Sequence, residues 1–256
     1  MEILIGITAF LASLLTLFSG FGLGTLLMPV FGLFFPVPLA IALTGVVHLL
    51  NNLFKLSLMY RHASRDMILR FGVPSLLGGL AGALVLVGLS GLPVLFRWQW
   101  DGHLFEVSYL KLVVALLMIV FALLEALPIL KLSGWASRYL SAGGLLSGFF
   151  GGLSGHQGAL RSAFLIQCGL SKEQYIATGV VIATMVDGIR LPVYFNRFAS
   201  GNAVEQWPVL LVATLCAFAG AYIGTRYLHK VTLRLVQWIT SVMILTVALL
   251  LGSGIL

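Results

Sequence analysis

Residues 20–29 read GFGLGTLLMP and residues 151–158 read GGLSGHQG, and each glycine-rich stretch interrupts a long apolar run without a polar loop. Glycine disfavours helix, so each run is expected to break here into two short helices. Irregular backbone at membrane depth is tolerated where protein or a hydrated cavity satisfies its polar groups. The two breaks are therefore predicted to line a site. The alternative is that their glycines only let helices pack closely.

The rest of the chain is apolar enough for lipid to be its solvent. Of 256 residues, 60% are hydrophobic and 9% are charged, and the mean hydropathy is +1.07. Such a chain folds as an all-α, polytopic membrane helix bundle, which we expect to form a single membrane domain over residues 1–256. The apolar runs are 2–18, 26–35, 37–59, 71–90, 109–127, 138–150, 158–169, 175–195, 207–225 and 232–251.

The two halves of the sequence match each other at one offset, without gaps. This offset places Gly24 on Gly158, Thr44-Gly45-Val46-Val47 on Thr178-Gly179-Val180-Val181, Tyr60 on Tyr194 and Pro74 on Pro208. We therefore expect internal repeats over 1–127 and 138–256, joined by a cytoplasmic linker, 128–137. Each repeat would contain a glycine-broken helical hairpin followed by three transmembrane helices.

The positive charges predict how the repeats are oriented, because Lys and Arg in short loops favour the cytoplasmic side. If each broken hairpin returns to its starting side, the second repeat is inverted, and both termini lie outside the cytoplasm. Inverted repeats are typical of secondary transporters. The net charge of +7 then reflects membrane orientation, and no basic patch interleaved with aromatics indicates nucleic acid. The cytoplasmic loops would hold Arg61, Arg65, Arg70, Lys131, Arg138, Lys172, Arg226, Lys230 and Arg234.

Ionisable residues inside apolar runs are the candidates for function, because burying them in a membrane is costly. Lys55, Arg161 and Arg190 outnumber Asp187, and an excess of buried positive charge favours an anionic ligand. Helix N-termini after the breaks would add unpaired N–H groups and the positive end of the helix dipole. The predicted substrate-binding residues are Gly22, Gly24, Thr25, Asn51, Asn52, Lys55, His156, Gln157, Arg161, Asp187 and Arg190.

Each of these residues also has a plainer interpretation. Lys55 and Arg161 can extend to the membrane interface with their charged ends in water. Asp187 and Arg190, three residues apart on one helix, can form a structural ion pair. His48 shares a helical face with Lys55, but a lone histidine in a bundle is more often structural. No metal site or cofactor is expected.

The glycine-rich segment from Gly20 to Pro29, its counterpart from Gly148 to Gly158 and the two Thr-Gly-Val-Val stretches resemble the sulfite exporter TauE/SafE family over nearly the whole chain. Members of that family are anion permeases of bacterial and archaeal inner membranes. The resemblance implies an oxyanion substrate, namely sulfite, sulfoacetate or another organosulfonate. One departure is Gly155-His156-Gln157-Gly158, where the family often has three consecutive glycines, so substrate details can differ.

We therefore expect a secondary transporter that moves a small sulfur-containing anion across the inner membrane. A coupled proton or other ion and a homodimer are possible partners besides the lipid bilayer. An anion channel and a carrier of a non-sulfur organic anion are the alternatives. A membrane-embedded enzyme is a third class, but the sequence contains no H-E-x-x-H, no G-x-S-x-G and no phosphate-binding loop, so an enzyme is not expected.

Overall fold

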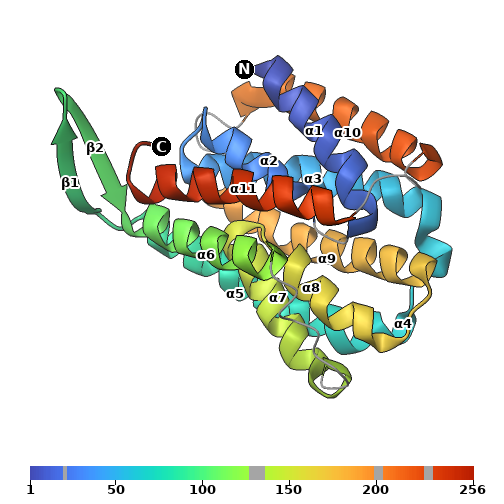
Figure 1. Ribbon diagram of the computed structural model, residues 1–256. Coiled ribbons are helices and arrows are strands. Elements are labelled where there is room, and N and C mark those ends of the chain that lie inside the picture. Colours follow the sequence, from blue (N-terminus) through green and yellow to red (C-terminus); the bar gives the residue numbers. More distant parts are fainter. Residues whose placement is uncertain (20–21, 127–135, 199–203, 228–232) are drawn as a thin grey trace.

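The computed structural model describes residues 1–19, 22–126, 136–198, 204–227 and 233–256, and these form a helical bundle with one β-hairpin (Figure 1). Short 3₁₀ helices η1 (Tyr60–His62), η4 (Ala136–Tyr139), η5 (Ile166–Cys168) and η6 (Val204–Gln206) and one π-helical turn, η2 (Ile68–Gly72), adjoin longer helices. The α-helices are α1 (Glu2–Ser19), α2 (Leu23–Gly32), α3 (Val37–Met59), α4 (Arg65–Met67), α5 (Val73–Ser90), α6 (Tyr109–Ala126), α7 (Leu140–Ser154), α8 (Gly158–Leu165), α9 (Lys172–Phe198), α10 (Trp207–Tyr227) and α11 (Leu233–Gly252).

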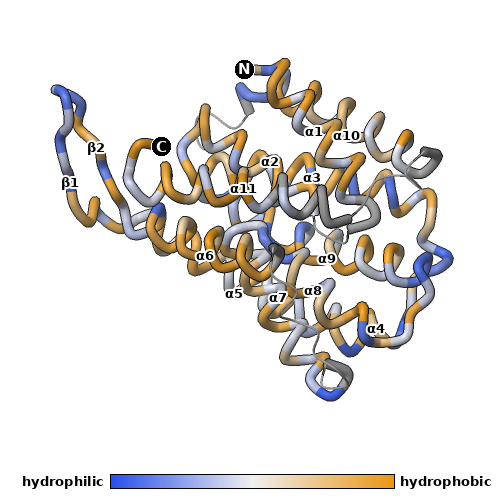
Figure 2. The backbone as a smooth tube through the Cα atoms, viewed as in Figure 1, coloured by the Kyte–Doolittle hydropathy of each residue, from blue (hydrophilic) through white to orange (hydrophobic). Residues whose placement is uncertain are grey.

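Each predicted apolar run corresponds to a helix, so the mostly helical membrane fold is confirmed. Within the described part of the chain, four helical segments are long and apolar enough to cross a bilayer: Val37–His62, Arg65–Ser90, Lys172–Asn196 and Trp207–Gly224. The remaining apolar helices are shorter. Figure 2 shows hydrophobic residues along the helices and hydrophilic residues gathered at the ends of the bundle and at the hairpin tip. This distribution matches a bundle whose sides face lipid.

The expectation of an all-α fold is wrong between α5 and α6, where strands β1 (Val94–Trp100) and β2 (His103–Ser108) pair in antiparallel. Asp101 and Gly102 form the turn with φ of 47° and 79°. An Asp-Gly pair with positive φ at both residues is the preferred two-residue hairpin turn, and aromatic residues on both sides favour strands. Trp98 stacks on Phe105 across the hairpin and donates through Nε1 to the Ser253 carbonyl oxygen, 2.6 Å away.

The glycine breaks are shorter than predicted. Helix α7 continues through Gly151 and Gly152 to Ser154 and ends at Gly155, whose φ of 82° is left-handed. The second break is therefore Gly155 to Gln157. In the first break, α2 already begins at Leu23, while residues 20–21 lie outside the described part of the chain. The predicted linker 128–137 also falls almost entirely outside it.

Glycines on α5 and α7 bring these two helices into backbone contact, which is where the plain packing interpretation holds. A Cβ atom built at Gly148 would overlap the backbone carbonyl of Ser75, and one at Gly152 would overlap that of Gly79. A similar contact joins α1 and α10, where a Cβ atom at Gly220 would overlap the carbonyl oxygen of Phe10. No side chain separates the helices at these points, so both pairs are held at the closest possible distance.

Candidate functional site

The two glycine breaks meet inside the bundle. A Cβ atom at Gly24, in the first turn of α2, would lie 3.5 Å from the carbonyl oxygen of Gly155. Gly22 caps the start of α2, and the Thr25 hydroxyl, itself buried, donates to the Gly22 carbonyl oxygen at 2.5 Å. The N-termini of α2 and α8 are therefore both directed to the middle of the protein.

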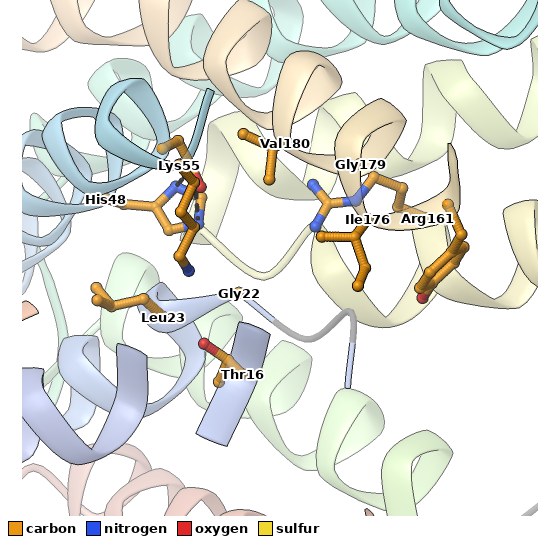
Figure 3. Close-up of a pocket in the computed structure, with 11 residues that line it drawn as sticks. Thr16, Gly22, Leu23, His48, Lys55, Arg161, Ile176, Gly179 and Val180 are labelled. Carbon is orange, nitrogen blue, oxygen red and sulfur yellow. Dashed lines mark hydrogen bonds between the residues drawn. The ribbon is translucent and has the colours of Figure 1, made fainter. Parts of the chain in front are cut away.

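A small pocket lies beside these breaks, between α1, α2, α3, α8 and α9 (Figure 3). Its volume of about 40 Å³ is enough to hold roughly three water molecules, since a cavity needs about 10–15 Å³ for each. Figure 3 shows the side chains of Lys55 and Arg161 entering this pocket from different sides. Its lining consists of Thr16, Gly22, Leu23, His48, Asn52, Lys55, Arg161, Tyr175, Ile176, Gly179 and Val180.

Both cations are inside the bundle, and not at its surface as the interface interpretation would have it. Lys55 is 5% exposed and Arg161 6% exposed. With the Asn51 amide oriented so that its oxygen faces Lys55, this oxygen accepts from Lys55 Nζ at 3.1 Å and the amide nitrogen donates to the Ala217 carbonyl at 3.2 Å. A Cβ atom at Gly179 would lie 3.4 Å from Arg161 Nε, so glycine at this position leaves room for the guanidinium group.

A second buried group of charges forms the wall behind the pocket. Asp187 Oδ1 accepts from Arg190 Nε at 2.9 Å and from Arg190 Nη2 at 2.8 Å, while Asp187 Oδ2 lies 2.5 Å from His48 Nδ1. Arg190 Nη1 also donates to the Gly151 carbonyl oxygen at 2.9 Å, and the Tyr194 hydroxyl donates to that of Gly152. The carboxylate of Asp187 thus offsets Arg190, as the structural ion-pair interpretation has it. The positive charge that faces the pocket comes from Lys55 and Arg161.

The structure brings some of the predicted site residues together and separates others. Gly22, Asn52, Lys55 and Arg161 line the pocket, and Asn51 supports Lys55 from behind. Gly24 and Thr25 lie in the first turn of α2, whereas Asp187 and Arg190 lie behind His48 and do not line the pocket.

His156 and Gln157 lie elsewhere in the second break. The His156 ring is parallel to that of Phe121 on α6, with centroids 6.1 Å apart, and its Nδ1 lies 2.9 Å from the Ser154 carbonyl oxygen. Gln157 packs against Gly151, and its carbonyl oxygen accepts from the Ser147 hydroxyl at 3.0 Å. Both side chains are buried, but neither lines the pocket.

Sequence reasoning missed several lining residues. His48 was interpreted as structural, although its shared helical face with Asn52 and Lys55 is the signal that places it in the pocket. Gly179 belongs to a repeated Thr-Gly-Val-Val stretch, and this repetition was used only to align the halves. Nothing in the local sequence marks Tyr175. Among the residues that the structure describes, no cluster of His, Cys, Asp and Glu is arranged to hold a metal ion.

Comparison with known protein families identifies the family of this chain. No curated protein and no solved structure matches the chain. The family model described as "Sulfite exporter TauE/SafE" matches residues 5–251, which include both breaks and every residue that lines the pocket. The chain therefore belongs to the sulfite exporter TauE/SafE family, a family of multi-pass membrane transporters and not of enzymes.

Proposed function

We propose that this protein is a secondary carrier of a small sulfur-containing anion, such as sulfite, sulfoacetate or another organosulfonate, and that the pocket beside the glycine breaks binds it. The observation that carries the proposal is the pair of buried cations, Lys55 and Arg161, that line one pocket. Burying two positive charges in a bilayer is costly unless a negative charge offsets them. The oxygens of Asp187 contact Arg190 and His48, and an anion bound in the pocket would add negative charge beside Lys55 and Arg161.

The size of the pocket favours the smallest of these substrates. A volume near 40 Å³ accommodates an oxyanion of a few heavy atoms such as sulfite, whereas a longer organosulfonate needs the pocket to widen. The backbone N–H groups at the start of α2 would supplement the side chains, because a helix N-terminus favours anions. We therefore place sulfite first among the candidate substrates.

The packing of the helices supports the proposal that the two halves are inverted repeats. The sequence offset relates α1, α2, α3, α5 and α6 to α7, α8, α9, α10 and α11. Helix α1 packs against α10 and α7 against α5; α3 packs against α10 and α9 against α5; α2 packs against α11 and α6 against α8. Exchanging the repeats thus turns each of these contacts into another observed contact, as a pseudo-twofold axis would.

Along α9, the pocket lies near the start of the helix and an apolar cluster lies near its end, and this asymmetry supports alternating access. On one side the pocket reaches Tyr175 and Ile176 in the first turns of α9, near the loops of Arg61, Arg65 and Lys172. We assign this side to the cytoplasm from the positive charges and place both termini outside it. Farther along α2 and α9 lies an apolar cluster that includes Met28, Leu153, Leu191 and Tyr194, and none of its members lines the pocket. The membrane we propose is the inner membrane of a bacterial or archaeal cell.

Counterflow in proteoliposomes tests the proposal. Vesicles loaded with unlabelled sulfite should accumulate labelled sulfite transiently in the presence of the wild-type protein. Lys55→Gln and Arg161→Gln should each weaken sulfite binding by roughly 30-fold or more, since removing a buried charge partner costs about 2–5 kcal/mol. Arg65→Gln is the matched control, because Arg65 is an exposed cation of the neighbouring loop. Unchanged affinity in both pocket variants would contradict the assigned site.

Other outcomes distinguish the remaining functions. Unitary currents in a planar bilayer would identify a channel and exclude the carrier. Counterflow of carboxylates without counterflow of sulfite or sulfonates would identify a carrier of non-sulfur anions. Formation of a product from a sulfur compound by purified protein in detergent would contradict a transport function.

A further inference from the structure

His48 connects the anion pocket to the buried charges behind it. Its ring lines the pocket, and its Nδ1 lies 2.5 Å from Asp187 Oδ2. A carboxylate only accepts hydrogen bonds, so Nδ1 carries the hydrogen in this contact and Nε2 of the neutral ring has a free electron pair. Nε2 faces Gly22, since a Cβ atom at that residue would lie 3.0 Å from it. His48 therefore presents a proton-accepting nitrogen beside the first glycine break.

Asn52 is placed to accompany a change of protonation at this nitrogen. Its amide nitrogen lies beside both ring nitrogens, 3.1 Å from His48 Nδ1 and 3.4 Å from Nε2, and a small rotation toward Nε2 lets it donate to the free electron pair. If Nε2 takes up a proton, half a turn of the same amide presents the Asn52 carbonyl oxygen as an acceptor. Both protonation states of His48 are thus compatible with the packing on one turn of α3.

The charges around His48 make its protonation depend on the contents of the pocket. Helix α9 contributes Asp187, which contacts the ring, and Arg190, which lies behind Asp187. The pocket adds Lys55 from α3, Arg161 from α8 and the phenol group of Tyr175 from α9. Helices α2, α5 and α10 also contact α3. The described residues of α2 and α5 include no ionisable side chain. On α10, the ionisable side chains that the structure describes are Cys216, which packs on Gly6, and Tyr222, which is exposed.

We propose that His48 Nε2 binds one proton together with the anion, so that the carrier moves the anion and a proton in the same direction. With the pocket empty, a proton on His48 would add a third positive charge beside Lys55 and Arg161. An anion between these groups offsets their charge and favours that proton, and by linkage the proton strengthens anion binding by the same factor. Asp187 holds the ring in place through its contact with Nδ1. This inference rests on the proposed function and adds the coupled ion to it.

The first test uses the purified wild-type protein and needs no variant. Thiosulfate is the probe because it keeps its two negative charges near neutral pH, whereas sulfite itself takes up a proton there. Calorimetric titrations in buffers with different ionisation enthalpies give the number of protons taken up with each thiosulfate. We expect uptake of up to about one proton, and thiosulfate affinity that rises about 5–150-fold when His48 is protonated. Binding without proton uptake would overturn the coupling and leave the carrier proposal intact. If neither thiosulfate nor sulfite binds, both proposals fail.

The second test assigns the proton to His48. In proteoliposomes, a pH gradient with the acidic side outside should drive accumulation of thiosulfate by the wild-type protein and by His62→Gln, a change at an exposed histidine in η1, beyond the end of α3. His48→Gln retains a polar side chain next to Asp187 but has no titratable group, so the number of protons per anion should fall to zero. Proton uptake that persists in His48→Gln, in either assay, would overturn the assignment.

Discussion

Replacing Asp187 by asparagine removes the negative charge from the buried group that links α3 and α9. The carboxylate forms two contacts with Arg190, at 2.8 and 2.9 Å, and one with His48 at 2.5 Å, and all three residues are at most 4% exposed. Removing one partner of a buried ion pair leaves the other charge uncompensated, at a cost of about 3–5 kcal/mol. We therefore expect Asp187→Asn to lower the free energy of unfolding by that amount, a large part of the total for a single domain.

The matched control is the ion pair between Asp66 and Arg70. Its atoms are 2.9 Å apart, as in the buried pair, but its side chains are 55% and 64% exposed. Such a pair contributes about 0–1 kcal/mol, so Asp66→Asn should have little effect. Reversible unfolding in mixed detergent micelles, followed by tryptophan fluorescence, measures both changes. The double variant Asp187→Asn/Arg190→Gln should be more stable than the sum of the single changes predicts, because it leaves no unpaired charge. An Asp187→Asn effect no larger than that of Asp66→Asn would refute this reasoning.

Three further changes test the packing. Gly148→Val places a branched side chain against the Ser75 carbonyl and should destabilise the protein by about 1–3 kcal/mol or prevent folding, which the yield of monodisperse protein measures. Gly88→Val is the control, because nothing lies within 4 Å of a Cβ atom at that position. Tyr194→Phe removes a buried hydroxyl that donates to the Gly152 carbonyl and should cost about 1 kcal/mol in chemical denaturation, against no measurable cost for Tyr60→Phe, whose side chain is exposed. Trp98→Phe keeps the stack on Phe105 but loses the hydrogen bond to Ser253, so proteolytic cleavage near the C-terminus should become faster. An unchanged cleavage rate would show that this bond does not hold the residues after α11 in place.

The helices were predictable because a membrane helix is recognisable from the length and hydropathy of its apolar run. The ten apolar runs predicted the order of the ten longer α-helices that the structure describes, but not the short helix α4. The ends of α3 and α6 agree with the prediction to within one residue, whereas α7, α8 and α9 differ from it by two to four residues at one end or both. The β-hairpin is not predicted by the apolar runs, because residues 91–108 lie between two of them and read as a connection. Its Asp-Gly turn between aromatic segments is nevertheless a readable local signal.

The candidate site was only partly predictable. Scarcity of charge in apolar runs identified Lys55, Arg161, Asp187 and Arg190, since each is costly to bury. The sequence predicts the helix on which each of these residues lies and their spacing along it, but not which residues of other helices each side chain contacts. It therefore does not distinguish the cations that line the pocket from the ion pair behind them. Tyr175 illustrates the limit, because it reaches the pocket only through the way α9 packs against α3.

The glycine seams between α5 and α7 and between α1 and α10 restrict how this protein can change shape. At these contacts the two backbones touch and no side chain lies between them, so sliding one helix along the other would make backbone carbonyl groups overlap. The two helices of each seam are therefore expected to move together as a rigid body. The hinges of the transport cycle are left to the breaks and to the α3–α9 crossing, and spin labels placed across a seam should report one unchanging distance while labels across that crossing report two.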